Sequence, residues 1–482
     1  MRILLINPPW LRFFGGSTNR PHLSLSHIAS YVASMTDHEV DLYDADFDEK
    51  KIENRLWPIS FFSGHENYVK RVNDADDVIW MEIAQAIEDF LPDVVGISSM
   101  TATYASTLQI AKVTKRVAPR CRVVLGGKHP SETSELVLEN RDVDYVVIGE
   151  GEETIVELLD NLDSPEKVRG IAFRENDKIV RNVARNFIKK LDELPIPVFD
   201  SKITVYPFEK HPSPNQVWTM IGARGCPFKC TYCAAERKVR ARSFEHITKE
   251  IKYVREKYGI TWFDFVDDSF SFNAKRVQDA CNYLEPLDVS WTCNTRVDLL
   301  DESIVKSMKN AGCKSIAVGI ESASPTTLKK IRKKINLEQM DAGVRLLQKN
   351  GIDVHGYFII GFEWETSSDM FATYEYAKKL KLNECEINVA TPLPGTELYN
   401  DLIASGKLVP SDVDWSRFHQ GSSDMNFSDV PDKEWAQTIF SILTKVTNYG
   451  KSRLWLRRLE YFVSPKDLVS RILYRLRKVM SR

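Results

Sequence analysis

The apolar and polar positions in the first part of the chain follow two different patterns. Short apolar runs predict buried strands, and the stretches between them place apolar residues at helical spacing. The expected strands lie at residues 3–6, 40–43, 94–98, 123–127 and 143–148, and the expected helices at 23–35, 83–90 and 105–117 and from residue 154. Because strands alternate with helices, this part predicts a doubly wound, Rossmann-like parallel sheet. Ligands of such sheets bind at the carboxyl ends of the strands.

The same alternation returns between residues 206 and 405. Strands are expected at residues 217–222, 262–266, 291–296, 315–322, 354–361 and 386–391, with helices between them. Six parallel strands predict a partial (β/α)6 barrel, which carries its chemistry at the carboxyl ends of the strands. We therefore expect an α/β protein with a first domain at residues 1–183, a linker at 184–205, the barrel at 206–405 and a helical C-terminal region at 406–482.

The composition limits the cellular compartments and the classes of partner that we expect for this protein. The chain has 482 residues, of which 43% are hydrophobic and 27% charged, and its formal net charge is −2. This balance gives no reason to expect a nucleic-acid partner. No apolar stretch reaches the roughly 18 residues of a membrane span. Residues 2–7 read as a strand directly after Met1, which leaves no room for a targeting peptide, so we expect a cytoplasmic protein.

The tail from Lys451 departs from this average. It is rich in lysine and arginine, its only acids are Glu460 and Asp467, and aromatic and leucine residues interleave with the basic ones. A basic amphipathic helix of this kind lies on anionic membranes, which would place the protein at the inner face of the membrane. The alternative is a helical hairpin that caps the barrel, with arginines that snorkel to solvent.

Three cysteines give the most specific indication of chemistry in the sequence. Cys226, Cys230 and Cys233 follow the expected strand at 217–222 with the spacing Cys-x3-Cys-x2-Cys. A structural zinc site needs four ligands, and neither a fourth cysteine nor a suitably spaced histidine is close in the sequence. Three thiolates can hold a [4Fe–4S] cluster and leave one iron without a protein ligand, where a substrate can bind. The other five cysteines are predicted to be reduced core residues.

The triplet, with Tyr232 directly before its third cysteine, resembles the signature of radical S-adenosylmethionine enzymes. The resemblance implies that Cys226, Cys230 and Cys233 are the catalytic metal ligands and that S-adenosylmethionine binds at the open iron. An electron from a donor such as flavodoxin or ferredoxin then releases a 5′-deoxyadenosyl radical, which abstracts hydrogen. Further contacts to S-adenosylmethionine are implied at the strand ends for Asp267, Asp268, Arg296, Glu321, Gly361 and Pro394. Taken singly, the arginine is equally compatible with a surface ion pair and each glycine with a turn.

The strand ends of the first domain suggest a second cofactor. They contain Pro8, Pro9, Ser98, Ser99, Thr101, Gly126, Gly127, His129, Gly149, Glu150 and Gly151, but no Walker motif and no Gly-x-Gly-x-x-Gly. Together they resemble the cobalamin-binding domain that precedes many radical S-adenosylmethionine cores, which implies that they bind cobalamin. The Asp-x-His-x-x-Gly motif that supplies an axial histidine in other cobalamin proteins is absent. The resemblance thus implies a lower cobalamin face covered by residues 98–104; a ligand-free adapter domain is the alternative.

The two resemblances together imply an enzyme that methylates an unactivated carbon with two molecules of S-adenosylmethionine. The basic tail adds the expectation of a lipid-like or other hydrophobic substrate. One alternative is a cyclase, or an enzyme that forms or rearranges carbon–carbon bonds without methyl transfer; another is a non-catalytic electron carrier. A methylthiotransferase is not expected, because that family has a further cysteine trio near its N-terminus, whereas Cys121 is the only cysteine before Cys226.

Overall fold

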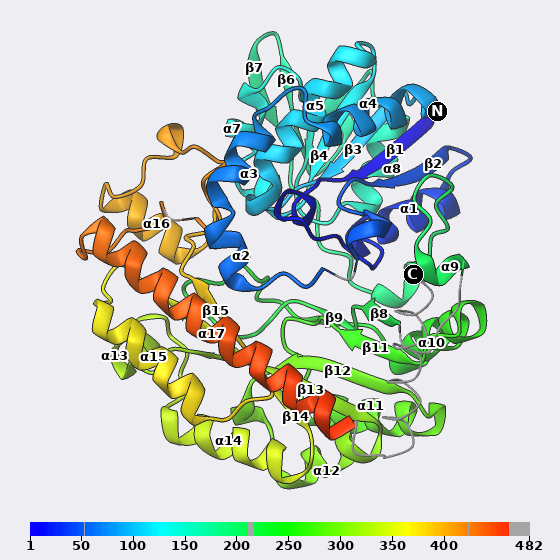
Figure 1. The fold of residues 1–482 in the computed structure, drawn as a ribbon. Helices are drawn as coiled ribbons and strands as arrows, with labels where there is room; N and C mark the ends of the chain where they lie inside the picture. Colours follow the sequence, from blue (N-terminus) through cyan, green and yellow to red (C-terminus); the bar gives the residue numbers. More distant parts are fainter. Residues whose placement is uncertain (53, 211–215, 423, 462–482) are drawn as a thin grey trace, which may run out of the picture.

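The computed structural model describes residues 1–52, 54–210, 216–422 and 424–461, with side chains described up to residue 452. The N-terminal sheet lies above the barrel in Figure 1, and a long C-terminal helix crosses the barrel side of the molecule. The basic tail from Arg453 to Arg482 lies outside the described side chains, so its contact with a membrane stays a prediction. Within the described ranges, no helix combines the length and the apolar character that crossing a bilayer requires.

The N-terminal sheet has the strand order β2-β1-β3-β4-β5-β6-β7. Its strands are β1 (Arg2–Asn7), β2 (Glu39–Asp44), β3 (Val94–Ser98), β4 (Arg122–Gly126), β5 (Tyr145–Val147), β6 (Ile171–Glu175) and β7 (Lys178–Arg181). Strands β1 to β5 are parallel as predicted, whereas β6 and β7 add an antiparallel edge. Asn176 and Asp177 between β6 and β7 both have positive φ, as the favoured two-residue hairpin turn requires.

Helices cover both faces of this sheet, because its parallel strands are apolar on both sides. The helices α1 (Leu23–Met35) and α8 (Glu152–Asp160) pack on one face, and α4 (Val78–Phe90) and α5 (Tyr104–Val117) pack on the other. The shorter helices α2 (Pro58–Ser63), α3 (His65–Val72), α6 (Lys128–Glu132) and α7 (Ser134–Glu139) lie in the connections. Of these elements, α2, α3, α6, α7 and the antiparallel hairpin were not predicted from the sequence.

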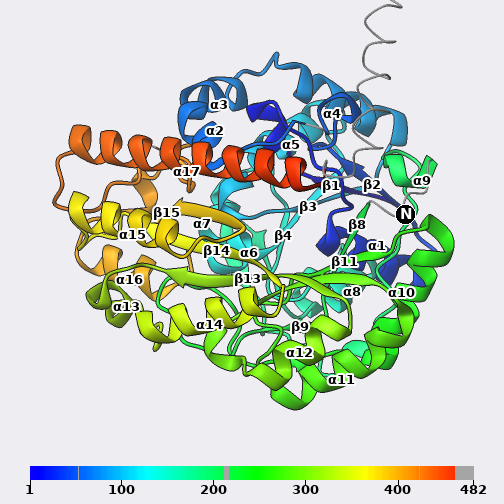
Figure 2. The same ribbon diagram turned by 60° about the horizontal axis from the view of Figure 1, so that its bottom comes forward.

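The second sheet has the order β15-β14-β13-β12-β11-β8, and every neighbouring pair is parallel. Its strands are β8 (Val217–Met220), β11 (Trp262–Phe265), β12 (Ser290–Thr295), β13 (Cys313–Glu321), β14 (Asp353–Ile360) and β15 (Glu384–Val389). The helices α10 (Phe244–Tyr258), α11 (Ala274–Leu284), α12 (Glu302–Asn310), α13 (Pro325–Lys330), α14 (Leu337–Lys349), α15 (Ser367–Lys379) and α16 (Glu397–Ala404) connect or follow the strands. Figure 2 shows α11, α12 and α14 along the outer side of this open sheet. The predicted partial barrel is confirmed.

Buried and half-buried residues alternate strictly along β12 and β14. The buried residues, among them Trp291 and Phe358, belong to the core that the sheet shares with its outer helices. Their neighbours along each strand, among them Thr292 and His355, therefore point to the concave side of the sheet. The inside of the barrel is thus lined by polar side chains.

Smaller elements join the two sheets. In the segment that follows β7, Leu191 and Leu194 pack against Tyr31 of α1. The short helix α9 (Pro207–Lys210) precedes β8, and the pair β9 (Ala223–Arg224) and β10 (Arg240–Ala241) encloses the cysteine loop. The helix α17 (Asp432–Tyr461) packs against α15, β15 and α2, so it contacts both parts of the molecule.

Candidate active site

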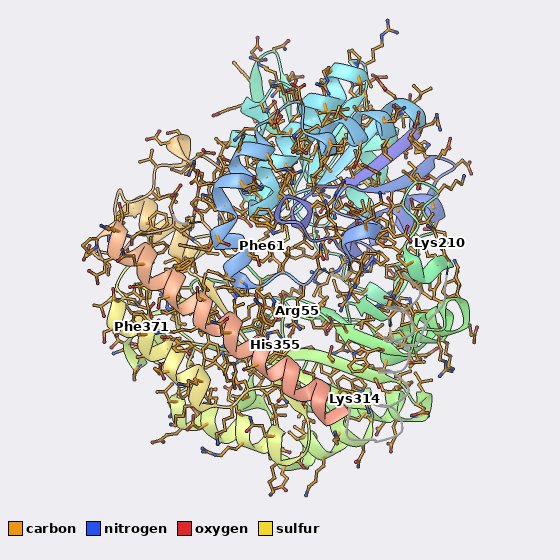
Figure 3. All side chains as sticks on the ribbon, viewed as in Figure 1. Arg55, Phe61, Lys210, Lys314, His355 and Phe371 are labelled. Atoms are coloured by element: carbon orange, nitrogen blue, oxygen red, sulfur yellow. The ribbon has the colours of Figure 1, made fainter. Side chains whose placement is uncertain are left out.

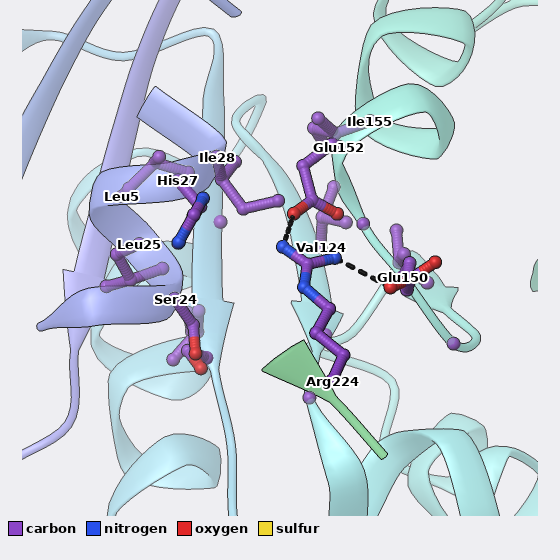
Figure 4. A pocket seen from close by; sticks show the side chains of 18 of the residues that line it. Leu5, Ser24, Leu25, His27, Ile28, Val124, Glu150, Glu152, Ile155 and Arg224 are labelled. Atoms are coloured by element: carbon purple, nitrogen blue, oxygen red, sulfur yellow. Dashed lines mark hydrogen bonds and ion pairs between the residues drawn. The ribbon is translucent and has the colours of Figure 1, made fainter. Parts of the chain in front are cut away.

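A cavity of about 270 Å³ lies at the carboxyl ends of β1, β3, β4 and β5, between α1 and β9 (Figure 4). We call it the glycine-lined cavity. Six of the predicted strand-end residues line it: Ser98, Gly126, Gly127, Gly149, Glu150 and Gly151. Apolar side chains, among them Leu5 and Val124, complete most of its wall. The cavity therefore lies where ligands bind in a doubly wound sheet.

Two of its glycines serve different purposes. Gly127 has φ +109°, and a Cβ there would lie 2.5 Å from the carbonyl oxygen of Ser99, so only glycine fits. At Gly126, by contrast, the nearest atom to an added Cβ would be the Cβ of Val147 at 3.8 Å, which is ordinary contact. Gly127 is thus required by the backbone, whereas Gly126 leaves space that a side chain would fill.

His27 of α1 was not predicted from the sequence, yet it lines the glycine-lined cavity (Figure 4). Its ring is buried, and Nε2 has no hydrogen-bond partner among the described residues. Burial, with smaller contributions from the charges of Arg224 and Arg242, lowers the pKa of His27 well below its usual value. The neutral ring therefore offers an unused hydrogen-bonding atom at the cavity. His27 belongs to no sequence motif, so only the packing of α1 beside the cavity shows that it lines the cavity.

Arg224 of β9 closes the cavity from the barrel side. Its guanidinium donates to Glu150 at 2.6 Å and also to Glu152, as the dashed lines in Figure 4 show. Arg240 of β10 donates to Glu150 as well, at 2.7 Å. The side chains of Glu150 and Glu152 are only 13% and 5% exposed, so these pairs join the two parts of the molecule away from solvent. We call this group the interdomain clamp.

Five predicted strand-end residues do not line this cavity: Pro8, Pro9, Ser99, Thr101 and His129. The His129 ring packs between Tyr104 and Trp415, with centroid distances of 4.1 and 4.7 Å, and its Nδ1 lies 3.2 Å from Thr101 Oγ1. Burial lowers the pKa of His129 to about 3. His129 is thus a neutral core histidine in this structure.

The three cysteines line a second cavity of about 320 Å³ at the carboxyl end of the barrel strands. We call it the cysteine pocket. Four of the residues predicted to contact S-adenosylmethionine line it as well: Asp267, Asp268, Arg296 and Glu321. Gly361 and Pro394 do not. The Gly361 N–H donates to Glu365, and its φ of +85° explains the glycine, because an added Cβ would make only ordinary contact with the Trp435 ring at 3.4 Å.

The backbone of the cysteine loop is held by its own neighbours. Gly225 has φ +96°, and a Cβ there would lie 2.6 Å from the carbonyl oxygen of Lys238, so a side chain is excluded just before Cys226. The Cys226 N–H donates to the Glu236 carbonyl at 2.7 Å. The Arg237 guanidinium donates to carbonyl oxygens of the loop, among them that of Cys233 at 2.9 Å. These contacts hold the backbone of the loop without the help of a metal.

The two adjacent aspartates have different roles. Asp267 is buried and accepts from the Gly222 N–H at 2.6 Å, and burial raises its pKa to about 6. Asp268 accepts from the Gly225 N–H at 3.2 Å and is exposed to the pocket. Asp267 therefore supports the strand end through Oδ1, and Asp268 is the more exposed of the two carboxylates at the pocket.

Arg296 and Glu321 both carry partners already. The Arg296 guanidinium donates from Nε and Nη2 to Asp298 at 3.0 and 2.9 Å and lies over the Phe228 ring. Glu321 has φ +68°, an unfavourable conformation for a side chain of its kind, and it accepts from the buried Lys333 at 2.8 Å. Lys333 also lines the pocket and was not predicted from the sequence.

Two family models match this chain. The radical SAM superfamily matches residues 220–377, and the B12 binding domain matches residues 66–159. An uncharacterized methyltransferase of Pyrococcus horikoshii is 33% identical over 432 residues, which are 87% of this chain and 86% of that protein. The chain belongs to the cobalamin-binding radical S-adenosylmethionine enzymes. Its predicted cofactors are thereby confirmed: a [4Fe–4S] cluster, S-adenosylmethionine and cobalamin.

Further relatives of this enzyme are named for two activities. Cytidylyl-2-hydroxyethylphosphonate methyltransferase of Streptomyces wedmorensis is 25% identical over 456 residues, 85% of this chain and 83% of that protein. Anaerobic magnesium-protoporphyrin IX monomethyl ester cyclase of Cereibacter sphaeroides is 28% identical over 345 residues, 68% and 56% of the two chains. The solved structure of OxsB, a cobalamin-dependent S-adenosylmethionine radical enzyme, covers 100% of this chain and 75% of its own at 17% identity and a TM-score of 0.68. That likeness shows a common fold.

The cysteine pocket of this enzyme fits the cluster. All three thiols are free, and burial raises the pKa values of Cys226 and Cys230. Iron must therefore displace their protons when it binds. The described lining of the pocket contains no fourth cysteine, so one iron would keep an open position.

The glycine-lined cavity fits part of cobalamin. Its apolar wall and missing side chains leave space for a large ligand, and His27 Nε2 lies at the wall without a partner among the described residues. Such a cavity with a few polar groups is typical of a cofactor site.

Proposed function

We propose that this enzyme is a cobalamin-dependent radical S-adenosylmethionine methyltransferase that acts on an unactivated carbon. The observation that carries the proposal is that one short segment contributes to both cavities: Arg224 lines one of them, and Cys226, two residues later, lines the other. A methyl carrier and a radical source would thus be held side by side. The methyltransferase of Pyrococcus horikoshii, which matches nearly the whole chain, supports methyl transfer.

In this proposal Cys226, Cys230 and Cys233 hold the cluster, and neighbouring charged groups orient S-adenosylmethionine. Asp268 is placed for its amino group. Arg296 is placed for its carboxylate, because Asp298 occupies Nε and Nη2 but not the Nη1 donors. When bound, the cluster and S-adenosylmethionine supply a hydrogen-abstracting radical, and cobalamin supplies the methyl group. The residues of the chain bind and orient these groups.

Cobalamin is proposed to occupy the glycine-lined cavity with part of its structure. Gly126 would let the ligand approach the backbone, and His27 Nε2 would hydrogen-bond with it. Glu150 was predicted to contact cobalamin, but its carboxylate is already bound by Arg224 and Arg240. We propose that Glu150 acts on the position of β9 and β10 through the interdomain clamp.

The substrate is proposed to carry polar groups. Tyr357 lines the cysteine pocket, and its ring lies 4.6 Å from that of His355 further along the inside of the barrel. Asp264 and Glu386 lie on the same inner face, and Arg55 reaches it from the N-terminal domain near His355, as Figure 3 shows. A long hydrocarbon chain would desolvate these groups without pairing them. The lipid-like substrate suggested by the tail rests on residues outside the described side chains.

The test uses anaerobically reconstituted enzyme that holds cobalamin, with dithionite as the electron source and S-adenosylmethionine that carries a trideuterated methyl group. Incubated with a cell extract of small polar metabolites, the enzyme should release 5′-deoxyadenosine and S-adenosylhomocysteine and transfer the labelled methyl group to one product. A lipid extract serves as the comparison. Without labelled product in either extract, the proposal of methyl transfer fails.

Cyclisation is the second candidate, favoured by the match to the anaerobic cyclase over 68% of this chain. It predicts 5′-deoxyadenosine and a changed product without the deuterium label. The third possibility from the sequence, a non-catalytic electron carrier, predicts no 5′-deoxyadenosine at all. The same experiment therefore distinguishes all three.

A further inference from the structure

The segment between β13 and α14 concentrates positive charge at the surface. Five of the six residues from 329 to 334 are lysine or arginine. Lys329, Lys330, Arg332 and Lys334 are exposed, whereas Ile331 and Lys333 between them are buried. The net charge of the whole chain is only −2, so this density is local. Nothing in the proposed chemistry of methyl transfer uses the four exposed residues.

The exposed charges surround a hollow of about 430 Å³. Lys329, Arg332 and Lys334 line it together with the apolar side chains of Pro325, which is exposed, and Leu337, which is half-buried. The hollow lies between α13 and α14, which follow one another in Figure 2. We call it the basic groove. An apolar floor within a charged rim is the arrangement of a protein–protein interface.

Most of these charges are not neutralised within the protein. Arg332 pairs with Glu397 at 2.8 Å, but Lys329 and Lys334 have no ion pair among the described residues. Both Arg332 and Lys334 have φ +54°, in the left-handed region that side chains of this kind rarely adopt. The segment is thus held in an unfavourable conformation that keeps its basic side chains at the surface.

The same segment contacts the cysteine loop directly. The Thr231 N–H, between the second and third cysteines, donates to the Ile331 carbonyl at 3.2 Å. Lys333, between the two strained residues, reaches into the cysteine pocket and pairs with Glu321. The basic groove is therefore one hydrogen bond away from the backbone that carries the cluster ligands.

We propose that the basic groove is the docking site of an acidic one-electron carrier protein that reduces the cluster. One electron leaves the reduced carrier and converts the [4Fe–4S]²⁺ cluster to [4Fe–4S]⁺; no bond forms or breaks, and no proton moves. Charge complementarity steers such a partner to the rim, and the apolar floor accepts apolar side chains at the centre of its interface. The inference rests on the cluster and not on methyl transfer, so each proposal can fail without the other.

The test measures the second-order rate at which flavodoxin hydroquinone bleaches the visible absorbance of the reconstituted holoenzyme, by anaerobic stopped flow at low salt. The double variant Lys329→Glu and Lys334→Glu should slow this reaction about tenfold or more, because steering by opposite charges raises association rates by at least that factor. The reaction of the native enzyme should slow as salt rises towards about 0.5 M, and that of the variant should not. Reduction by dithionite, which needs no docking, should stay unchanged in both.

Two control variants separate docking from damage. Lys112→Glu with Lys178→Glu makes the same charge change at exposed positions of the N-terminal domain and should leave the rate unchanged. Lys329→Arg with Lys334→Arg keeps the charge and should retain the native rate. If the glutamate variant loses iron, the milder Lys329→Gln with Lys334→Gln replaces it, with a smaller slowing expected.

The proposal is overturned if the groove variant reacts with flavodoxin as fast as the native enzyme, or if both control pairs slow the reaction equally. It is also overturned if the groove lysines are needed for cosedimentation with phosphatidylglycerol vesicles but not for reduction by flavodoxin. That result would assign the groove to an anionic lipid surface.

Discussion

The two cavities of this enzyme both lie at the carboxyl ends of parallel strands, yet they are built in opposite ways. The glycine-lined cavity exists because side chains are missing, as at Gly126, and its wall is largely apolar. The cysteine pocket is crowded with charged side chains, and two of them, Glu321 and Lys333, are buried as an ion pair. One site is suited to a large ligand held by shape, and the other to a small charged ligand held by directed hydrogen bonds.

The comparison also shows where the two sites depend on one another. Arg224 belongs to the wall of the glycine-lined cavity and pairs with Glu150 and Glu152 of the N-terminal domain. It is also two residues from Cys226, the first of the proposed cluster ligands. A shift of the N-terminal domain would therefore move the cysteine loop. The following experiments test how far the two cavities are separate and how strongly the clamp couples them.

Loss of one thiol should have the largest effect and should be confined to the cysteine pocket. Cys230→Ala leaves two thiolates, which cannot hold the cluster, so iron, sulfide and the formation of 5′-deoxyadenosine should fall to background. Cobalamin binding should remain, because the glycine-lined cavity contains no cysteine. Metal analysis measures the iron content, and cobalamin absorbance after gel filtration measures cobalamin binding.

Cys281→Ala, in the core on α11, is the control and should keep its iron. Cobalamin lost together with iron would show that the cavities are not separate.

Removal of the clamp should cost stability next. Arg224→Ala leaves Glu152 buried without its partner, which typically costs about 3–5 kcal/mol of the free energy of unfolding. The matched control is Arg141→Ala, whose pair with Asp177 is 69% and 79% exposed and should cost less than about 1 kcal/mol. Urea denaturation followed by circular dichroism compares the two. Equal urea midpoints for the two variants would mean that the interdomain clamp does not stabilise the contact between the N-terminal domain and the barrel.

The sequence predicted the clamp poorly and the scaffold well. Helices Leu23–Met35 and Tyr104–Val117 end at the predicted residues, because the spacing of apolar residues is a local property. The cysteine triplet was equally readable, because its three ligands lie within eight residues of one another. Partnerships between distant residues were not readable. Glu150 and Arg224 are 74 positions apart, and only the packing of two domains brings them together.

The same limit applies to single residues of the site. Gly361 and His129 stand in motifs that suggested cofactor contacts, but the structure shows them packed against Trp435 and Trp415, from the C-terminal part of the chain. His27 shows the converse, because it lines a cavity without belonging to any motif. A motif gives the strand end at which a residue lies, whereas the direction of its side chain depends on what packs behind it.

Filling the glycine-lined cavity should affect only cobalamin. At Gly126 a Cβ meets no atom closer than 3.8 Å, so Gly126→Leu should fold normally and place its side chain in the cavity. We expect cobalamin affinity to fall about a hundredfold, or about 2.7 kcal/mol, with iron content and melting temperature unchanged. Gly126→Ala, with a much smaller side chain, should lose far less. The affinity is measured by titration of apo-enzyme with cobalamin, and native affinity in the leucine variant would place the cofactor elsewhere.

The smallest effect is expected at His129, and it appears only in the dependence on pH. Burial lowers the pKa of His129 to about 3, whereas the unfolded chain has the usual value of about 6.5. As pH falls below about 6.5 the unfolded chain takes up a proton that the folded chain does not. The loss of stability from this residue therefore approaches about 1.4 kcal/mol per pH unit in acid and becomes negligible above about pH 7.5.

His129→Phe removes that contribution and keeps the ring against Tyr104 and Trp415, which are uncharged in this range. The difference in unfolding free energy between variant and native protein should be constant above about pH 7.5 and should shift by about 1 kcal/mol in favour of the variant between about pH 6.5 and 5.5. Urea denaturation at about pH 7.5, 6.5 and 5.5 measures it. The other buried titratable groups are common to both proteins and cancel in the difference.

The absorbance spectrum of bound cobalamin should not change, because His129 does not line the glycine-lined cavity. A changed spectrum with a constant difference in stability would instead make His129 a ligand of the cofactor.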